Sequence, residues 1–380
     1  MSVFDSPAFE GHEALHAFHD EASGLRSFIA VHSTARGPAA GGCRMWTYAS
    51  EQAAIDDALR LSRAMSFKNA VADLELGGGK SVIIGDSKTA KTPALFEAFG
   101  RAVEAVGGRY WSAEDVGVSP GDLAHARKAT RYIAGLEGHA AASGDPSPVT
   151  AEGIYRGIVL CVRRVFDRDL SGVTVAIQGA GHVGAYLADK LAADGARLVI
   201  ADVNEASARA VAARTGAAIV PPEAIFDVEA DVFAPCALGG AISQATLPRL
   251  KARIVAGGAN NQLAGPEVGR ALYDRGLVYA PDFVINGGGI INVAGEIRAL
   301  ERGEAHDPAW VEAKLARLME TLDEILDRST REARPTHDIA LEIAQARIAS
   351  ARGLGAPDVT RRGRNRFPAR ARLRTSPGPT

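Results

Sequence analysis

The sequence is poor in cysteine, and this shortage excludes several kinds of site. Its three cysteines, Cys43, Cys161 and Cys236, lie far apart in a chain of 380 residues and form no CxxC pair. Neither a thiolate zinc site nor a redox dithiol is therefore indicated, and a sparse, odd set fits a reducing cytosol. His16 and His19 have no acidic or cysteine partner at metal-ligand spacing, so we expect no metal.

Net charge and long apolar runs are also lacking. The formal net charge of −2 creates no field that would attract nucleic acid or an anionic membrane. No apolar stretch approaches the length that crosses a bilayer, and the N-terminal segment lacks the basic and apolar regions of a secretory signal. We expect a cytoplasmic protein that acts on a small molecule, without a nucleic-acid or membrane partner.

Glycine, in contrast, is abundant, with 41 copies, and the length of 380 residues is enough for two domains with separate cores. The Ser-, Pro- and Gly-rich segment 142–150 predicts the junction between them. Residues 1–145 alternate strand and helix signals, residues 146–334 repeat βα units, and a last helix at about 335–352 is expected to complete the first domain. We predict an α/β fold in which a mixed α/β domain precedes a Rossmann-type, doubly wound domain.

Hydrophobic periodicity predicts the individual elements. In the first domain it predicts strands at 26–32, 80–84 and 109–112 and helices at 51–72 and 93–106. In the second it predicts a helix at 151–166, strands at 173–178, 197–203, 232–234, 253–256 and 277–280, and helices at 308–334 and 339–351. The basic, proline-containing segment 356–380 lacks such periodicity. Its composition favours a disordered tail, and a nucleic-acid-binding arm is the alternative.

A glycine-rich turn follows the bare apolar strand VTVAIQ and opens a helix. Gly179, Gly181 and Gly184 match the GxGxxG pattern, with His182 and Val183 at its variable positions. The first glycine permits the tight turn, the second lets the backbone approach a pyrophosphate, and the third lets helix and strand pack closely. The N–H groups at the start of the helix would then face the phosphates. This setting predicts a dinucleotide site, and a turn without a ligand is the alternative.

The next strand, RLVIAD, ends at Asp202, about twenty residues further on. A carboxylate there can accept both ribose hydroxyls of NAD and would repel the 2′-phosphate of NADP. No arginine or lysine follows immediately, since the sequence continues Val203-Asn204-Glu205. NAD is therefore the predicted cofactor.

Two lysines in the first domain stand at unusual places. Lys68 lies at the end of an amphipathic helix, and Lys80 begins an apolar strand directly after three glycines. A buried ammonium is costly unless it has a partner or a task, and two lysines that converge on a cleft would lower each other's pKa. One could then hold a substrate carboxylate while the other acts near neutral pH. The alternative is that both side chains extend to solvent.

Several segments, in consistent order, carry a resemblance to a known family. They are GPAAGGCRMW (37–46), Lys68-Asn69, LGGGKSVIIGD (76–86), SAEDVG (112–117), VTAEGIYRGI (149–158), GGANNQL (257–263) and PDFVINGGGIINV (281–293). Over roughly residues 10–350 the chain resembles the leucine/phenylalanine/valine dehydrogenases of the glutamate dehydrogenase superfamily. GGCRMW and IINV look most similar to leucine dehydrogenases, and the arginine-rich tail is not part of the pattern. The resemblance implies reversible, NAD-dependent conversion of an apolar L-amino acid to a 2-oxo acid, ammonia and NADH.

The resemblance also implies roles for matching residues. Lys68 would bind the substrate carboxylate, in a pocket that the backbone at Gly77 and Gly78 helps to close. Lys80 would activate the water that attacks the imine carbon. Asp115 would act as general acid/base on the amino group and the carbinolamine.

Further implied roles connect the two domains. Asn261 would contact the substrate, with Asn260 beside it on the cofactor side, and Thr150 would hold the nicotinamide amide. Members of the family form homo-oligomers through the first domain. The resemblance therefore implies that the first domain serves both substrate binding and oligomerisation.

One position implies the choice of substrate. Glutamate-specific relatives carry a lysine immediately before a Gly-Gly pair, where this chain has Ala40. An apolar residue cannot pair with a γ-carboxylate, so glutamate should be rejected, and we favour leucine, with valine and isoleucine. An apolar pocket discriminates one methylene by only about 1–3 kcal/mol, so the small Ala40 leaves phenylalanine as the alternative. Matching positions add Met65, Ala113, Ile290 and Val293, although Met65 and Ala113 are also ordinary core residues by type.

Two functions of other classes are the competing hypotheses. A non-catalytic NAD-binding sensor would be favoured by loss of Lys80 or Asp115, and both residues are present. A 2-hydroxy-acid dehydrogenase would use a histidine paired with a carboxylate as its base. The first-domain motifs contain no such histidine, which argues against this reaction.

Overall fold

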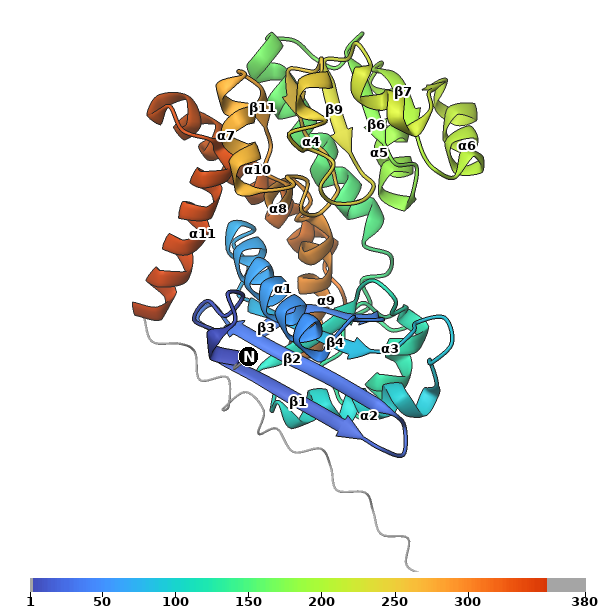
Figure 1. The fold of residues 1–380 in the computed structure, drawn as a ribbon, viewed down its shortest axis with the longest axis vertical. Helices are drawn as coiled ribbons and strands as arrows, with labels where there is room; N and C mark the ends of the chain where they lie inside the picture. Colours follow the sequence, from blue (N-terminus) through green and yellow to red (C-terminus); the bar gives the residue numbers. More distant parts are fainter. Residues whose placement is uncertain (1–2, 354–380) are drawn as a thin grey trace, which may run out of the picture.

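The chain folds into two α/β lobes joined by long helices (Figure 1). The computed structural model describes residues 3–353, and the predicted disordered tail, 356–380, lies outside them. The first lobe is built on a mixed sheet with the strand order β1-β2-β4-β3-β5, in which β3 runs parallel to both of its neighbours. Its strands are β1 (Ala14–Asp20), β2 (Leu25–Ser33), β3 (Ala39–Trp46), β4 (Gly77–Ile84) and β5 (Tyr110–Glu114).

Helices cover both faces of this sheet. The helices of the first lobe are η1 (Val3–Asp5), α1 (Glu51–Val71), α2 (Pro93–Ala105) and α3 (Pro120–Arg127). Phe28, Ala30 and Val82 pack against α1 on one face. The alternate β2 residues Ile29 and Val31 belong to the cluster that contains α2 on the other face (Figure 1). The central strands β2, β4 and β3 are therefore buried on both sides along most of their length.

The second lobe is built on a parallel sheet with the order β11-β10-β9-β6-β7-β8. Its strands are β6 (Thr174–Gln178), β7 (Arg197–Ala201), β8 (Ala218–Ile219), β9 (Val232–Pro235), β10 (Ile254–Val255) and β11 (Val278–Tyr279). The intervening helices are α5 (His182–Ala193), α6 (Glu205–Thr215), η2 (Pro222–Asp227), η3 (Leu247–Arg249) and α7 (Pro266–Asp274). Counted within the lobe, the strand order is 6-5-4-1-2-3, the order of dinucleotide-binding folds, with its switch point between β6 and β9. The predicted fold class is confirmed.

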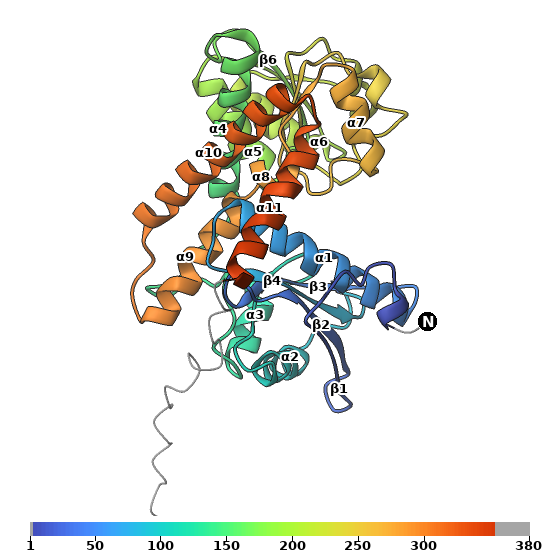
Figure 2. The same ribbon diagram turned by 90° about the vertical axis from the view of Figure 1, so that its left-hand side faces the viewer.

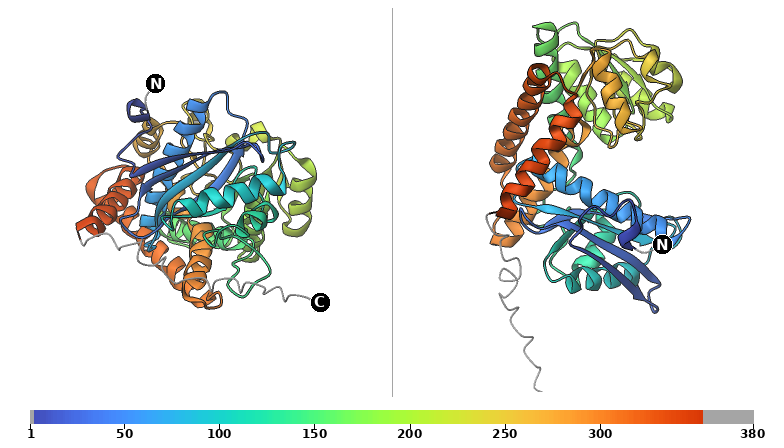
Figure 3. Two further views of the ribbon diagram at one scale, coloured as in Figure 1. Left: turned by 90° about the horizontal axis from the view of Figure 1, so that it is seen from below. Right: turned by 60° about the vertical axis from the view of Figure 1, so that its left-hand side comes forward.

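Five helices connect the lobes. They are α4 (Ser147–Phe166), α8 (Asp282–Ile285), α9 (Gly288–Arg302), α10 (Pro308–Glu332) and α11 (Thr336–Gly353). Helix α9 reaches down to the first lobe, α10 returns to the second, and α11 runs back to α1 (Figures 2 and 3). There the Arg347 guanidinium donates to the carbonyl oxygens of Ala70 and Val71, at 3.1 and 2.9 Å.

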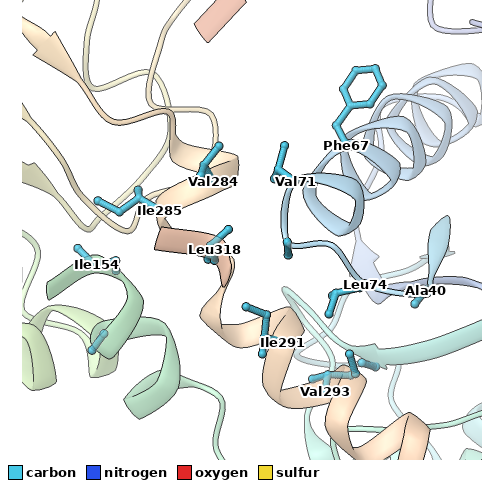
Figure 4. Packing of buried hydrophobic residues seen from close by; sticks show 14 of the residues in the cluster. Ala40, Phe67, Val71, Leu74, Ile154, Val284, Ile285, Ile291, Val293 and Leu318 are labelled. Carbon is cyan, nitrogen blue, oxygen red and sulfur yellow. The ribbon is translucent and has the colours of Figure 1, made fainter. Parts of the chain in front are cut away.

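Buried apolar side chains form one continuous cluster across both lobes (Figure 4). Val71 and Leu74 approach from the end of α1, Val284 and Leu318 come from α8 and α10, and Val293 lies on α9. The lobes are thus in apolar contact around their connecting helices. Within residues 3–353, no helix is long and apolar enough to cross a membrane.

Hydrophobic periodicity did not predict two elements beside the junction of the lobes. Strand β3 reads AAGGCRMW and α9 begins GGIIN, so glycines interrupt the apolar pattern in both. Helix α4 begins at Ser147, earlier than the predicted 151, and Thr150 therefore lies inside a helix. The predicted strands 253–256 and 277–280 shorten to two residues each in β10 and β11.

Candidate active site

A cavity of about 360 Å³ lies between the lobes. Strands β3, β4 and β5 and helix α1 supply its wall on the first lobe, and α4, α9 and the loop around Asn260 supply the opposite wall. Twelve of the predicted site residues line it: Ala40, Met65, Lys68, Lys80, Ala113, Asp115, Thr150, Val183, Asn260, Asn261, Ile290 and Val293. Residues from distant parts of the sequence thus meet in one cavity.

The most buried charges of the cavity form an ion pair. The Lys80 ammonium, on β4 and only 5% exposed, donates to Oδ2 of Asp115, which directly follows β5. Nε of Arg44 lies 3.3 Å from the same oxygen. Burial alone would raise the pKa of Asp115, but the Lys80 and Arg44 cations outweigh it and hold that pKa below its usual range. Asp115 is therefore a carboxylate at neutral pH, in contact with a lysine that could exchange a proton with substrate.

A second lysine faces the other lobe. Lys68, in the last turn of α1, donates from Nζ to Oδ1 of Asn260 at 2.9 Å, and Asn286 donates to the same oxygen at 2.9 Å. Burial lowers the pKa of Lys68 to about 8, with a further lowering by the Lys80 charge, whereas Asp282 and Asp115 oppose the shift. The lowering of the Lys68 pKa by the Lys80 charge has the direction expected when one lysine approaches another. A small anion that enters the cavity meets a cation whose present partner is only a neutral amide.

An apolar wall encloses the rest of the cavity. Besides the five predicted apolar residues, it contains Leu61, Ala64, Trp111 and Ile297, which the sequence reasoning missed. A Cβ on Gly41 would lie 1.9 Å from the carbonyl oxygen of Gly79, so glycine is needed where the two strands approach closely beneath this wall. The site can accommodate an aliphatic side chain without leaving a polar group unpaired.

Glu114 also lines the cavity and was not among the predicted residues. Burial, and then the charges of Asp145 and Glu137, raise its pKa. Its position beside Asp115 in the sequence was the available signal. Asn261, which was predicted, has a φ of 51°, in the left-handed region that asparagine tolerates.

Gly77 and Gly78 lie beneath α1, and in the described part of the chain they are not among the residues that line the cavity. A Cβ on Gly78 would be 2.1 Å from the backbone nitrogen of Ser66, and the Asn69 side chain donates to the Gly77 carbonyl at 2.5 Å. These glycines bring the end of α1 close to β4, and so bring Lys68 close to Lys80.

The glycine turn of the second lobe has the geometry of a phosphate-binding loop. Gly179 has a φ of 108°, and a Cβ on Gly184 would lie 2.1 Å from the Gly179 carbonyl oxygen. Around Gly181 there is open space for a Cβ, and α5 begins at the next residue, His182, without a side-chain cap. A tight turn, an open approach and uncapped helical N–H groups fit a pyrophosphate.

Asp202 follows β7 at the edge of this turn. Its Oδ2 accepts from the Ala180 backbone at 2.6 Å and its Oδ1 from that of Asn204 at 2.7 Å, so the carboxylate is fixed beside the loop. Val203 and Leu238, 91% and 85% exposed, are apolar residues on the flanking loops that the sequence reasoning missed. Exposed apolar side chains beside a phosphate-binding turn can pack against the face of a flat ring. The residues present therefore fit a dinucleotide.

Cysteine and metal chemistry find no support in the described part of the chain. Burial raises the pKa of the Cys43 thiol to about 12, so this residue remains a neutral thiol. Among residues 3–353, no group of three or more histidine, cysteine, aspartate or glutamate side chains could hold a metal ion.

The chain is similar to one family of known proteins. Residues 12–132 match the family described as Glu/Leu/Phe/Val dehydrogenase, dimerisation domain, and residues 200–354 match Glutamate/Leucine/Phenylalanine/Valine dehydrogenase. A leucine dehydrogenase of Thermoactinomyces intermedius is 44% identical over 92% of this chain and 94% of that protein. A valine dehydrogenase of Streptomyces albus is 42% identical over 90% of this chain and 93% of that one. The crystal structure of L-tryptophan dehydrogenase from Nostoc punctiforme aligns with a TM-score of 0.78 and 35% identity, over 90% of this chain and 97% of its own.

Proposed function

Since the chain belongs to the glutamate/leucine/phenylalanine/valine dehydrogenase family and is an amino-acid dehydrogenase, we propose that it deaminates an apolar L-amino acid oxidatively, with NAD. The products are a 2-oxo acid, ammonia and NADH, and the reaction is reversible. Leucine is the preferred substrate, with valine and isoleucine also accepted. The observation that carries this proposal is the buried Lys80–Asp115 pair, which opens on a cavity with a second lysine and an apolar wall.

The substrate is held at both ends. Lys68 exchanges its hydrogen bond with Asn260 for one with the substrate carboxylate. This exchange is favourable because an ammonium bonds more strongly to a charged acceptor than to a neutral one. Asn261 contacts the substrate from the other lobe. The side chain lies among Ala40, Met65 and their apolar neighbours, where a second carboxylate would be left without a cation.

The second lobe holds the dinucleotide. Bound NAD supplies the acceptor for the hydride that leaves Cα. The turn at Gly179 and Gly181 would hold the pyrophosphate, Asp202 would accept hydrogen bonds from the ribose hydroxyls, and Thr150 would hold the nicotinamide amide. Thr150 already donates its hydroxyl to the Pro146 carbonyl at 2.8 Å, so its oxygen remains available as an acceptor.

Proton transfer falls to the buried pair. As a neutral amine, Lys80 takes a proton from the water that adds to the imine carbon. Asp115 accepts a proton from the substrate nitrogen and returns it to that nitrogen in the carbinolamine. When Asp115 then takes the proton of the carbinolamine hydroxyl, the C=O bond forms, the C–N bond breaks and ammonia leaves. Lys80 lies inside β4 and Asp115 directly follows β5, so the sheet holds both groups oriented toward the cavity.

Kinetics test the reaction and the substrate together. We expect NADH formation with leucine, valine and isoleucine, little with glutamate, and a preference for NAD over NADP. We also expect ammonia-dependent reduction of 4-methyl-2-oxopentanoate, which a hydroxy-acid dehydrogenase would not require. Silence with every apolar amino acid would favour a non-catalytic NAD-binding sensor, and a higher kcat/KM for phenylalanine would identify a phenylalanine dehydrogenase.

Removal of the proposed base tests the mechanism. Lys80→Ala should lower kcat by about 10²–10⁴-fold, the range of a lost general base, while NADH still binds, as measured by fluorescence titration. Lys88→Ala removes an exposed lysine of the first lobe and should leave both quantities unchanged. Near-wild-type turnover of Lys80→Ala would contradict the mechanism.

We further propose that the protein is a cytoplasmic homo-oligomer. The first lobe matches a dimerisation domain, which supports a homo-oligomer formed through that lobe. Light scattering coupled to gel filtration should give a multiple of the chain mass, and a monomer would contradict the proposal. The sparse cysteines support a cytoplasmic location.

A further inference from the structure

A second cation stands behind the catalytic pair. Arg44, on β3, has its Nε 3.3 Å from Oδ2 of Asp115, the same oxygen that Lys80 contacts. Its Nη1 donates to Oδ2 of Asp57 on α1 at 3.0 Å, and the Tyr48 hydroxyl donates to that oxygen at 2.8 Å. Arg44 is thus anchored on its outer side while its inner side faces the reacting carboxylate.

The two cations differ in one chemical respect. Lys80 must lose its proton to act as a base, and at that moment its charge no longer balances Asp115. A guanidinium is not deprotonated in proteins, so the Arg44 charge persists through the whole reaction. Without it, a largely buried Asp115 beside a neutral amine would favour its protonated form and would lose its role as acceptor.

We propose that Arg44 is a positioning residue of this reaction, which keeps Asp115 ionised and turned toward the cavity while Lys80 changes its charge. This inference rests on the proposed function, because it presupposes the role of Asp115. Asp57 and Tyr48 in turn hold Arg44 in place.

A surface groove makes this proposal accessible to experiment. On the side away from the substrate, Arg44 lines a groove of about 550 Å³ together with Trp46, Tyr48, Asp57 and Val116. Trp46 and Val116 are 53% and 49% exposed, so the groove opens to solvent. If the arginine side chain is removed, a free guanidinium ion can enter from this side and occupy its place between the two carboxylates.

The test is chemical rescue of Arg44→Ala in the full-length enzyme. We expect kcat to fall at least about tenfold, as for partial loss of a general acid–base group, with KM for leucine and the Kd of NADH within about twofold of wild type. Guanidinium chloride at millimolar concentration should restore part of kcat, whereas sodium chloride at equal ionic strength should not. Arg44→Lys should retain more activity than Arg44→Ala, because it keeps a cation.

Arg60 supplies a matched control. It donates to the other oxygen of Asp57, Oδ1, at 2.6 Å, and is largely exposed. Arg60→Ala therefore removes an arginine from Asp57 without removing the partner of Asp115, and should leave kcat unchanged. If Arg44→Ala does not fold, Asp57→Asn tests the role of Arg44 instead. This variant retains Arg44 but weakens its hydrogen bond to residue 57, so kcat should fall.

The outcomes separate this inference from the proposed function. Wild-type kcat in Arg44→Ala, or a loss that guanidinium does not restore, overturns the role of Arg44. If Arg44→Ala cannot be obtained in folded form, an unchanged kcat in Asp57→Asn likewise overturns the role of Arg44. An active Asp115→Asn would instead overturn the proposed mechanism itself, whatever Arg44 does.

Discussion

At the scale of single residues, the active site places charge where burial makes charge costly. Lys80 and Asp115 compensate each other, and Arg44 adds a second cation to the same carboxylate oxygen. Breaking a buried pair by removing one partner leaves the other uncompensated and commonly destabilises a protein by about 3–5 kcal/mol. Substitutions in this group should therefore be read from kcat measured on protein shown to be folded.

The volume of the Ala40 side chain should set the size of the accepted substrate. Ala40→Leu adds carbon atoms to the apolar wall that also contains Met65 and should lower kcat/KM for phenylalanine at least about tenfold more than for valine. The physical reason is steric, since a well-packed wall does not yield to a ring. A panel of kcat/KM values checks this, with the exposed Ala90→Leu as control. Equal losses for both substrates would show that residue 40 does not face the substrate side chain.

Sequence motifs indicated the residues of the cavity better than they indicated its contacts. Lys80 and Asp115 stand in short motifs that contain glycines, and Lys68 stands in the polar sequence SFKN. Such motifs can be recognised without coordinates. Arg44 and Glu114 stand inside two of these motifs, GPAAGGCRMW and SAEDVG, but apart from the place of Glu114 beside Asp115 nothing in the sequence assigned them a role. Only the fold reveals that the Arg44 side chain returns to Asp115.

At the scale of elements, the βα repeats and long helices were predictable because their apolar spacing is regular. The elements β3 and α9 were not predictable, because their glycines permit close approach of backbones and have low strand and helix propensity. A Cβ on Gly288 of α9 would lie 2.2 Å from the Val149 carbonyl, and one on Gly41 of β3 would meet Gly79. Where two backbones touch, the glycines are explained by the neighbouring element. Periodicity within one element does not reveal that neighbour.

The contact between α1 and β4 gives an element-scale prediction. Gly78→Ala places a Cβ 2.1 Å from the Ser66 backbone nitrogen, so α1 must move away from the sheet. We expect the free energy of unfolding to fall by about 1–3 kcal/mol, the usual cost of overpacking, and KM for leucine to rise because Lys68 moves with α1.

Urea unfolding and steady-state kinetics measure these two effects. Gly121→Ala is the control, because its nearest neighbour would be the Ser119 hydroxyl at 3.8 Å and alanine favours a helix. Unchanged stability and KM in Gly78→Ala would mean that the two elements are not in close contact.

The contact between β2 and α1 gives a pH-dependent prediction. His32 on β2 shares a hydrogen bond of 2.7 Å with the Ser66 hydroxyl, and burial, helped by the His12 and Arg63 charges, lowers its pKa to about 4. An unfolded histidine has a pKa of about 6.5, so between these values the unfolded chain binds a proton that the folded chain does not. The free energy of unfolding should therefore decrease as pH falls from about 6.5 to about 4, by on the order of 3 kcal/mol from this group.

Urea unfolding at pH 7.5 and pH 5 checks the sign. In His32→Asn, whose amide can still bond to Ser66, the difference between the two pH values should shrink. His19→Asn removes an exposed histidine and should leave it unchanged. An undiminished difference in His32→Asn would assign the pH dependence to other groups.

At the scale of the whole molecule, the two lobes are coupled by apolar packing and by polar contacts, such as those of Lys314 and Arg347 with backbone carbonyls at and just beyond the end of α1. The Lys68–Asn260 hydrogen bond crosses the cavity itself, at the place proposed for the substrate carboxylate. Substrate binding therefore replaces a contact between lobes with a contact through substrate, and any closure that follows depends on the connecting helices. This hydrogen bond joins two residues that are 192 positions apart in the sequence, and no local pattern could predict such a contact.

Helix α11 is the support that fixes α1 relative to these connecting helices. Arg347 donates to the Ala70 and Val71 carbonyls at the end of α1 and to the Thr321 hydroxyl of α10 at 3.1 Å. Arg347→Met leaves those carbonyls without this donor, so the free energy of unfolding should fall by about 1–3 kcal/mol.

Because Lys68 lies in the same last turn of α1, Arg347→Met should also raise KM for leucine while the Kd of NADH stays unchanged. Thermal or urea unfolding and steady-state kinetics measure the pair of effects. Arg331→Met removes a 70% exposed arginine whose nearest carboxylate, that of Glu332, is 3.9 Å away, and it should alter neither. If Arg347→Met lost stability but kept its KM, α11 would support the fold without positioning Lys68, and the first lobe would orient that lysine alone.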